Sequence, residues 1–352
     1  MKKNLLILGM LLMACFTFTS CSDDDDNNEL RPTIKTDYYA YIVNAGNWNE
    51  NNGDITGVKA NTTGDAKTAW TVTNIYNTAN GYGIGDAQDA AIIGDKIFVT
   101  STTSSKVEVL DANGKVEKSI KLPNASPRYI AYDNDFAYVS AYDGKVYRFD
   151  AKTFEARGTV EVGAYAEGLS VSNGKLYVNI SNYMMDGTGK KVAVVDLKTF
   201  TKTKDIEVEL NPYSQSIAVG NKVFIVSNLD YTDNILQEIN TTTDTKKNIG
   251  KATTIAYDRT SNSLVCVYAV YGKPEKRLFR YDIATGKETD LNDLSDMSSP
   301  SRVCVDPTTK AIVIVEDSYM TPCKLFIYNF LGKLEDNSIS AGYGTQNVIF
   351  TR

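Results

Sequence analysis

Apolar and polar residues alternate along most of the chain in short runs, and turn-forming residues interrupt them about every ten positions. Alternation places every second side chain on one face, which predicts β-strands buried on one side. Residues 127–163 show the pattern with four runs, YIAYD, FAYVSA, KVYRFD and ARGTVEV. Asn-Asp, Asp-Gly and Lys-Thr-Phe segments join these runs and suit tight turns. Helical periodicity is almost absent, so we expect an all-β protein.

The first of these four runs recurs seven times along the chain, as AQDAAII, PRYIAYD, AEGLSVS, SQSIAVG, ATTIAYD, PSRVCVD and TQNVIFT. Six repeats separate the apolar anchor Ala90 from the anchor Val348, which gives 43 residues per repeat. Four strands recurring at roughly 40–45 residues are typical of one blade of a β-propeller. The seven copies therefore predict a seven-bladed β-propeller.

The two ends of the repeat array are incomplete in complementary ways. The array begins with YYAYIVNAG, which matches the second strand of a unit, and it finishes with TQNVIFTR, a first strand with nothing after it. We expect the C-terminal strand to complete the first blade, because this closes the ring and hides its edges. The propeller is predicted to span residues 38–352.

The repeat assigns the connections between strands to two ends of the ring. Connections between first and second strands, and between third and fourth strands, are short and polar, as in VSNGK and DIATGK. The opposite end carries the other connections, which contain many aromatic and methionine residues that turn geometry does not require. Variable loops on a repeat scaffold are where binding concentrates. We expect ligand contacts from Trp48, Tyr142, Tyr165, Tyr183, Met184, Met185, Tyr213, Tyr231, Tyr268 and Tyr319.

A polar column lies one residue before the core of each first strand, at the predicted channel mouth. Its members are Gln88, Arg128, Glu167, Gln215, Thr253, Ser301 and Gln346, and all but Thr253 and Ser301 are taken as ligand-binding candidates. Tyrosines supply rigid area with a hydroxyl group, which together with amides favours a broad ligand that is partly apolar. Two alternatives stay open: single rim residues could pack on neighbouring blades, and the column could merely hydrate the channel.

The chain contains no histidine. This removes the usual general base near neutral pH, the commonest transition-metal ligand and every Ser-His or Cys-His nucleophile. We therefore expect no enzymatic activity, no required cofactor and no metal site. Three cysteines, Cys266, Cys304 and Cys323, lie in the repeats, and an odd number in a chain this large predicts free or partly paired thiols rather than a disulfide scaffold.

The N-terminal sequence MKKNLLILGMLLMACFTFTSCSDDDD has a basic start and a short apolar run, which predicts a secretory signal over residues 1–20. Its end resembles the lipobox of bacterial lipoproteins, which implies a lipid on Cys21. Residues 21–37 form an acidic, pattern-free tether. Without Lys2 and Lys3 the chain has 35 basic and 43 acidic residues, a net charge of −8, which argues against nucleic acid as a partner.

The repeat array, with motifs such as PRYIAYDNDFAYVSAYDGKVYRFD and LYVNISN, resembles the YncE-type seven-bladed propellers. With CSDDDD in front, the chain is similar to a family of Bacteroidetes surface lipoproteins. The resemblance implies an anchor at the cell surface in the outer membrane, binding of cobalamin (vitamin B12) and transfer to a TonB-dependent B12 transporter. A glycan-binding surface propeller is the alternative. A propeller lyase fits less well, because that type relies on a histidine.

Overall fold

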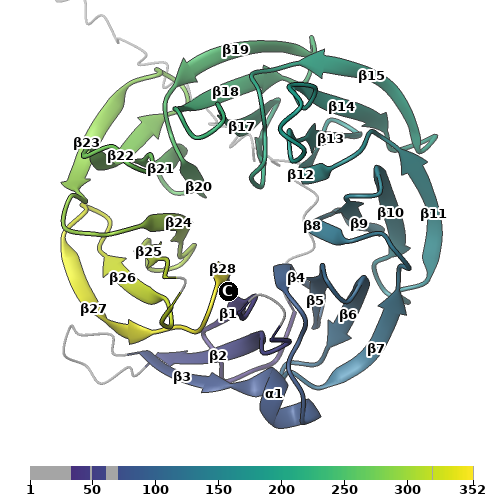
Figure 1. The fold of residues 1–352 in the computed structure, drawn as a ribbon, viewed down its shortest axis with the longest axis horizontal. Helices are drawn as coiled ribbons and strands as arrows, with labels where there is room; N and C mark the ends of the chain where they lie inside the picture. The colour runs from purple at the N-terminus through teal and green to yellow at the C-terminus, as the bar shows by residue number, and fades with distance from the viewer. Residues whose placement is uncertain (1–32, 48–49, 61–69, 319, 352) are drawn as a thin grey trace, which may run out of the picture.

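Seven four-stranded antiparallel sheets stand around a central axis in the computed structural model, which describes residues 33–47, 50–60, 70–318 and 320–351 (Figure 1). The predicted seven-bladed β-propeller is confirmed. Blade one consists, from the axis outward, of β28 (Thr345–Phe350), β1 (Ala40–Asn44), β2 (Asp54–Ala60) and β3 (Trp70–Asn74).

The other six blades follow in chain order, each with its first strand nearest the axis (Figure 1). Blade two contains β4 (Ala87–Ile93), β5 (Lys96–Ser101), β6 (Lys106–Leu110) and β7 (Val116–Lys121). Blade three contains β8 (Pro127–Tyr132), β9 (Phe136–Ala141), β10 (Lys145–Asp150) and β11 (Ala156–Glu161). Blade four contains β12 (Ala166–Ser172), β13 (Lys175–Ile180), β14 (Lys191–Asp196) and β15 (Thr201–Glu207).

Blade five contains β16 (Ile217–Val219), β17 (Lys222–Asn228), β18 (Asn234–Asn240) and β19 (Thr245–Gly250). Blade six contains β20 (Thr254–Asp258), β21 (Ser263–Ala269), β22 (Lys276–Asp282) and β23 (Glu288–Asp293). Blade seven contains β24 (Pro300–Val305), β25 (Ile312–Glu316), β26 (Lys324–Tyr328) and β27 (Leu334–Ser340).

The C-terminal strand closes the ring as predicted. β28 pairs with β1 in antiparallel register, with Val348 opposite Ile42. The Thr345 hydroxyl donates to Asn44 Oδ1 at 2.7 Å. The Thr351 hydroxyl donates to the backbone oxygen of Tyr38 at 2.9 Å. Blade one therefore joins the two ends of the repeat array through a strand ladder and two side-chain hydrogen bonds.

Apolar side chains fill the space between neighbouring blades. Tyr138 of blade three packs in one buried cluster with Leu176 and Val178 of blade four, while Phe224 of blade five shares another with Phe279 of blade six. Burying a side chain of this size contributes about 1.5–3 kcal/mol. The outer strands are polar instead. In β11, for example, the first four residues are all exposed. Exposed polar and charged side chains on such edges discourage pairing with other chains.

Asp or Asn side chains form the turns at the end of the ring that carries the short polar connections. Asp150, for example, accepts hydrogen bonds from the backbone N–H groups of Lys152 and Thr153 at 3.0 and 2.9 Å. Such turns satisfy their own backbone donors. The same side-chain-to-backbone pattern recurs at Asp111, Asp133, Asp196, Asn240, Asp258, Asp282, Asp306 and Asn329.

A β-bulge interrupts most of the innermost strands at the polar column. In β4, Ala87 lies opposite Ser101 but Asp89 lies opposite Thr100, so Gln88 is an extra residue. Register shifts at the same place occur in β8, β12, β24 and β28. A bulge re-aims side chains and often adjoins a functional site. The bulges place Gln88, Arg128, Glu167, Ser301 and Gln346 at irregular backbone positions near the axis.

The three cysteines of the repeats are free and buried, in agreement with the sequence-based expectation. Burial raises the pKa of the Cys304 thiol to about 11, which keeps it protonated. Cys304 and Cys323 belong to one apolar cluster between blades one and seven. They act there as small core residues.

One short helix, α1 (Ile75–Asn80), follows β3 and lies on the outside of the ring (Figure 1). In the described ranges no helix has the length and apolar character needed to cross a membrane. The Asp54 side chain accepts a hydrogen bond from the Tyr76 N–H at 3.1 Å, which holds the start of α1 against β2. Its other carboxylate oxygen, Oδ2, is buried without a hydrogen-bond partner.

Asp54 should make the stability of the protein depend on pH. Burial raises the pKa of its carboxyl group from 3.8 to about 7, and hydrogen bonds from the Tyr76 backbone only partly offset this. A raised carboxyl pKa means that the folded state holds the proton more tightly than the unfolded state. The contribution is therefore greatest at low pH, falls between about pH 4 and pH 7, and is constant above.

We expect Asp54→Asn to remove this dependence. The free energy of unfolding of the parent, minus that of Asp54→Asn, should fall with pH by up to about 1.4 kcal/mol per unit between pH 5 and pH 7. Urea unfolding at several pH values measures the difference, with the exposed Asp95→Asn as control. A difference that stays flat across this range would contradict the buried, protonated carboxyl.

Candidate ligand-binding site

The exposed large apolar side chains gather at one end of the propeller. Of the nine such side chains in the described part of the chain, seven lie there, on connections between second and third strands or on segments leading into an inner strand: Tyr82, Tyr183, Met184, Met185, Tyr231, Tyr271 and Met320. Only Leu331 and Leu334 lie at the end formed by the Asp and Asn turns. Exposed apolar side chains grouped in this way mark interaction surfaces. We call this end the ligand face.

A hydrogen-bonded network occupies the mouth of the axial channel on the ligand face. Arg128 Nε donates to Glu167 Oε2 at 2.9 Å, and Arg128 Nη1 donates to Gln88 Oε1 at 2.6 Å. The Tyr142 hydroxyl donates to the other Glu167 oxygen at 2.7 Å. Gln88 Nε2 lies 3.4 Å from Gln346 Oε1. Five of the predicted site residues therefore form one connected group, which we call the mouth network.

The mouth network is largely removed from water. The side chains of Arg128 and Glu167 are 15% and 4% exposed. Burial raises the pKa of Glu167, and the Arg128 charge and the Tyr142 hydroxyl partly offset this. Burial and the Glu167 charge both raise the pKa of Tyr142, so its hydroxyl stays protonated and donates. A buried ion pair with every oxygen bonded fixes the geometry of the residues around it.

Three tyrosine rings form an aromatic cluster directly beside the mouth network. The ring centroids of Tyr142 and Tyr183 are 4.9 Å apart, those of Tyr165 and Tyr183 are 5.3 Å apart, and those of Tyr142 and Tyr165 are 5.5 Å apart. The Arg128 guanidinium lies 4.7 Å from the Tyr142 ring centroid. Tyr142 thus belongs to both groups, and it joins an aromatic surface to a polar mouth.

The loop that carries Tyr183 is shaped by Asn182, a buried residue that sequence reasoning missed. Asn182 N donates to Asn211 Oδ1 at 3.0 Å, and Asn182 Oδ1 accepts from Gly187 N at 2.8 Å. Its side-chain amide also donates to Asp230 Oδ1 at 3.2 Å, on the next loop. These bonds hold Tyr183, which is 58% exposed, against the other two rings. The only hint of this role in the sequence is that an asparagine stands at the start of a long polar loop.

A small pocket of about 170 Å³ lies beside the aromatic cluster. Tyr165 and Met184 line it together with Gly163, Ala164, Ile180, Ser181, Asp186, Thr188 and Lys191. The hydroxyl group of Ser181 is buried without a hydrogen-bond partner. The pocket thus extends the aromatic surface outward along blade four.

Gln215 and Tyr213 approach the mouth from blade five. Gln215 Oε1 accepts from Leu169 N at 2.9 Å, and Gln215 Nε2 donates to the Ile130 backbone oxygen at 3.0 Å, so this amide reaches across blade four. Gly168 allows the approach, because a Cβ atom at this position would collide with the Ser214 backbone oxygen. The Tyr213 hydroxyl donates to the backbone of Thr253 at 3.4 Å.

The remaining predicted residues are not part of the aromatic cluster or the mouth network. Met185 and Tyr231 are 62% and 64% exposed on their loops. Tyr268 is buried, and its hydroxyl donates to Asp233 Oδ1 at 2.9 Å, so its ring supports the neighbouring loop from below. Three predictions fall outside the described residues: Trp48, Tyr319 and the lipid-bearing Cys21.

Two charged residues at the mouth were not anticipated. Arg302 Nη2 donates to Gln346 Oε1 at 2.9 Å, which extends the mouth network to blade seven. Asp89 accepts from Ile130 N at 3.0 Å and from Asn347 Nδ2 at 3.2 Å. Burial raises the pKa of Asp89 to about 6, although these hydrogen bonds oppose the rise. Each of these residues comes directly after a member of the polar column in sequence. In a strictly alternating strand the side chain at that position would point away from the axis.

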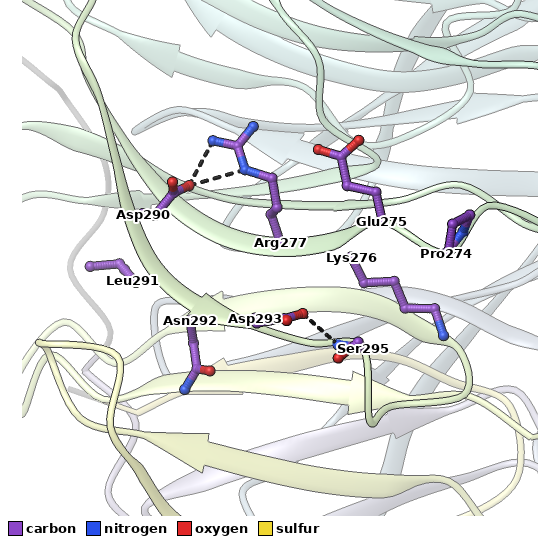
Figure 2. Close-up of a pocket in the computed structure, with 9 residues that line it drawn as sticks. All are labelled: Pro274, Glu275, Lys276, Arg277, Asp290, Leu291, Asn292, Asp293 and Ser295. Carbon is purple, nitrogen blue, oxygen red and sulfur yellow. Dashed lines mark hydrogen bonds and ion pairs between the residues drawn. The ribbon is translucent and has the colours of Figure 1, made fainter.

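A larger hollow of about 470 Å³ is lined by residues of the paired outer strands β22 and β23 of blade six and of the segments next to them (Figure 2). Its arginine is already paired with carboxylates: Arg277 Nη2 contacts Asp290 Oδ1 at 2.7 Å and Glu288 Oε2 at 3.1 Å. Figure 2 shows Arg277 turned towards Asp290 rather than into open space. The mouth network and the aromatic cluster form the better candidate site, because they combine burial, charge and exposed rings.

These observations define the class of protein: a seven-bladed β-propeller with a polar and aromatic mouth at one end. No family model matches the chain, and no curated protein matches it. Many solved structures share the fold. A quinonprotein alcohol dehydrogenase-like protein from Bacteroides thetaiotaomicron aligns over 90% of this chain and 78% of its own, with a TM-score of 0.64 and 14% identity.

Two further solved structures are similar over smaller or more divergent alignments. Kuenenia stuttgartiensis hydrazine synthase aligns over 67% of this chain and 74% of its own, with a TM-score of 0.54 and 16% identity. A chain of the mitotic checkpoint complex aligns over 89% of this chain and 96% of its own, with a TM-score of 0.53 and 10% identity. At these identities the likeness shows the fold alone.

Proposed function

We propose that this protein is a surface lipoprotein that binds cobalamin or a related corrinoid at the ligand face. In this proposal a lipid on Cys21 anchors it to the outer face of the outer membrane. It passes the bound corrinoid to a TonB-dependent transporter. The family resemblance motivates the ligand, the anchor and the partner.

The observation that carries the proposal is the junction at Tyr142 between an aromatic surface and a network of amide and guanidinium groups. A corrin is a broad disc whose edge carries amide side chains. Tyrosine faces suit the disc, and glutamine and arginine side chains suit the amides. The chain has no histidine, so no imidazole can replace an axial ligand of the cobalt. The corrinoid would be bound by its surface and released chemically unchanged.

We expect cyanocobalamin and methylcobalamin to bind with similar affinity, since the upper axial group is not displaced. Tyr183→Ala should weaken binding of both by about 2 kcal/mol, roughly 30-fold, because a few aromatic anchors dominate such sites. Leu331→Ala, an exposed apolar residue at the opposite end, is the matched control and should bind as the parent does. Isothermal titration calorimetry measures all of these affinities.

The outcome that rejects the proposal is equally direct. If the parent protein at micromolar concentration gives no heat with either cobalamin, corrinoid binding is wrong. If Tyr183→Ala and Leu331→Ala bind equally well, the ligand is held elsewhere than at the aromatic cluster.

A further inference from the structure

Arg302 brings a positive charge to the channel mouth and has no carboxylate partner among the described residues. It lies in β24, directly after the extra residue of the bulge, and is partly buried. Its Nη1 donates to the Ser301 backbone oxygen and its Nη2 to Gln346 Oε1, both at 2.9 Å. No carboxylate of the described residues lies within 4.0 Å of its guanidinium group. Both of its hydrogen-bond partners are neutral.

Five other arginines among the described residues are paired with carboxylates or stacked on aromatic rings. Arg128 pairs with Glu167, and Arg280 pairs with Asp258. Arg157 and Arg277 each contact two carboxylates, whereas Arg148 stacks between the rings of Phe136 and Phe200. Partial burial of a guanidinium group costs free energy unless an anion compensates it. Arg302 carries this cost at the position where ligand contacts are expected.

The charge of Arg302 lowers the pKa of tyrosine residues in blades three and five. Burial raises the pKa of Tyr129 to about 12, and the Arg302 charge acts against this rise. Burial also raises the pKa of Tyr213, which precedes β16, and the Arg302 charge opposes this rise as well. The hydrogen bond from Arg302 Nη2 to Gln346 Oε1 of blade one places the guanidinium group beside the mouth network.

The carboxylates nearest the mouth are already occupied. Glu167 accepts from Arg128 and from the Tyr142 hydroxyl. Asp89 accepts from the Ile130 backbone and from the Asn347 amide. Neither carboxylate forms an ion pair with Arg302, so its charge is left for another anion to compensate.

We propose that Arg302 binds an anionic group of the ligand, a phosphate or a carboxylate, at the axial mouth. A guanidinium group matches two oxygens of such a group and prefers it to a neutral partner. Gln346 orients Arg302 and is itself held by Gln88, so the donor is positioned before the ligand arrives. The inference rests on the mouth being a ligand site, but not on the ligand being a corrinoid.

The first test compares cyanocobalamin, which carries a phosphodiester, with dicyanocobinamide, which lacks it. By calorimetry, Arg302→Gln should lower the affinity for cyanocobalamin about tenfold and leave the affinity for cobinamide unchanged. Arg157→Gln, an arginine on the outside of blade three, serves as control and should change neither. An equal loss for both ligands would assign Arg302 a structural role and overturn the inference.

The second test is independent of corrinoids and separates the two proposals. The side-chain N–H signal of Arg302 is followed by NMR in the full folded chain during titration with sodium phosphate and with sodium acetate. A saturable shift with either anion supports the site, and the stronger of the two identifies phosphate or carboxylate as the preferred group. If the protein binds no cobalamin but Arg302 responds, the anion site stands and the corrinoid proposal falls. If Arg302 responds to neither anion and Arg302→Gln leaves cyanocobalamin affinity unchanged, the anion site is wrong.

Discussion

Deletion of residues 346–352 should lower the melting temperature by about 10 °C or more, or drive the protein into aggregates. The deletion removes nearly all of β28, its ladder to β1 and the buried Val348. Loss of one inner strand exposes the edge of β1 and the apolar cluster between blades one and seven. A loss of several kcal/mol corresponds to a shift of this size in a large domain.

The matched control keeps the strand and changes one side chain. Gln346→Ala retains the β28 ladder, so its melting temperature should stay within a few degrees of the parent. Differential scanning calorimetry and light scattering measure both proteins. A truncated chain that melts like the parent would show that β28 is not needed to hold the ring.

Glu167→Ala should destabilise the fold by about 3 kcal/mol or more, because it leaves the Arg128 charge buried without its partner. Arg128 would keep only Gln88 as a side-chain acceptor, and Tyr142 would lose the acceptor of its hydroxyl. The aromatic cluster should loosen as a result, and near-ultraviolet circular dichroism should report the change.

Two further variants separate charge from shape. The double variant Arg128→Leu with Glu167→Leu removes both charges and should recover much of the lost stability. Glu161→Ala, an exposed glutamate at the end of β11, should have little effect. Guanidinium chloride unfolding compares the four proteins. If Glu167→Ala unfolds at the same denaturant concentration as Glu161→Ala, the Arg128–Glu167 ion pair does not stabilise the folded protein.

The architecture was predictable because a repeat reports its pattern many times. Seven copies of one strand pattern fix the number of blades, and the unmatched strands at the two ends fix how the ring closes. The helix α1 was not predictable by the same route, because six residues are too few to show a helical period. Its position depends on Asp54, a contact between residues distant in sequence.

The candidate site was predictable only as far as the repeats can be aligned. The aligned position one residue before each first-strand core found Gln88, Arg128, Glu167 and Gln346, which the structure joins in one network. It missed Arg302, because the bulge in β24 alters which side chains approach the axis. The prediction of an exposed ligand contact was wrong for Tyr268, whose side chain is buried. Its segment resembles the rim loops in composition, but Tyr268 still belongs to β21 and its ring packs in the cluster of blades five and six, which local sequence does not encode.

The mouth network also has an order of assembly. Gln346 lies in β28, which follows blade seven in sequence, and it connects Arg302 with Gln88. Blades two to seven contain no residue of β28, so six blades can form while this connection is still missing. β28 therefore both closes the ring and carries Gln346, the residue that completes the mouth network. A molecule in which β28 is not docked therefore has an open ring and an incomplete mouth network at the same time.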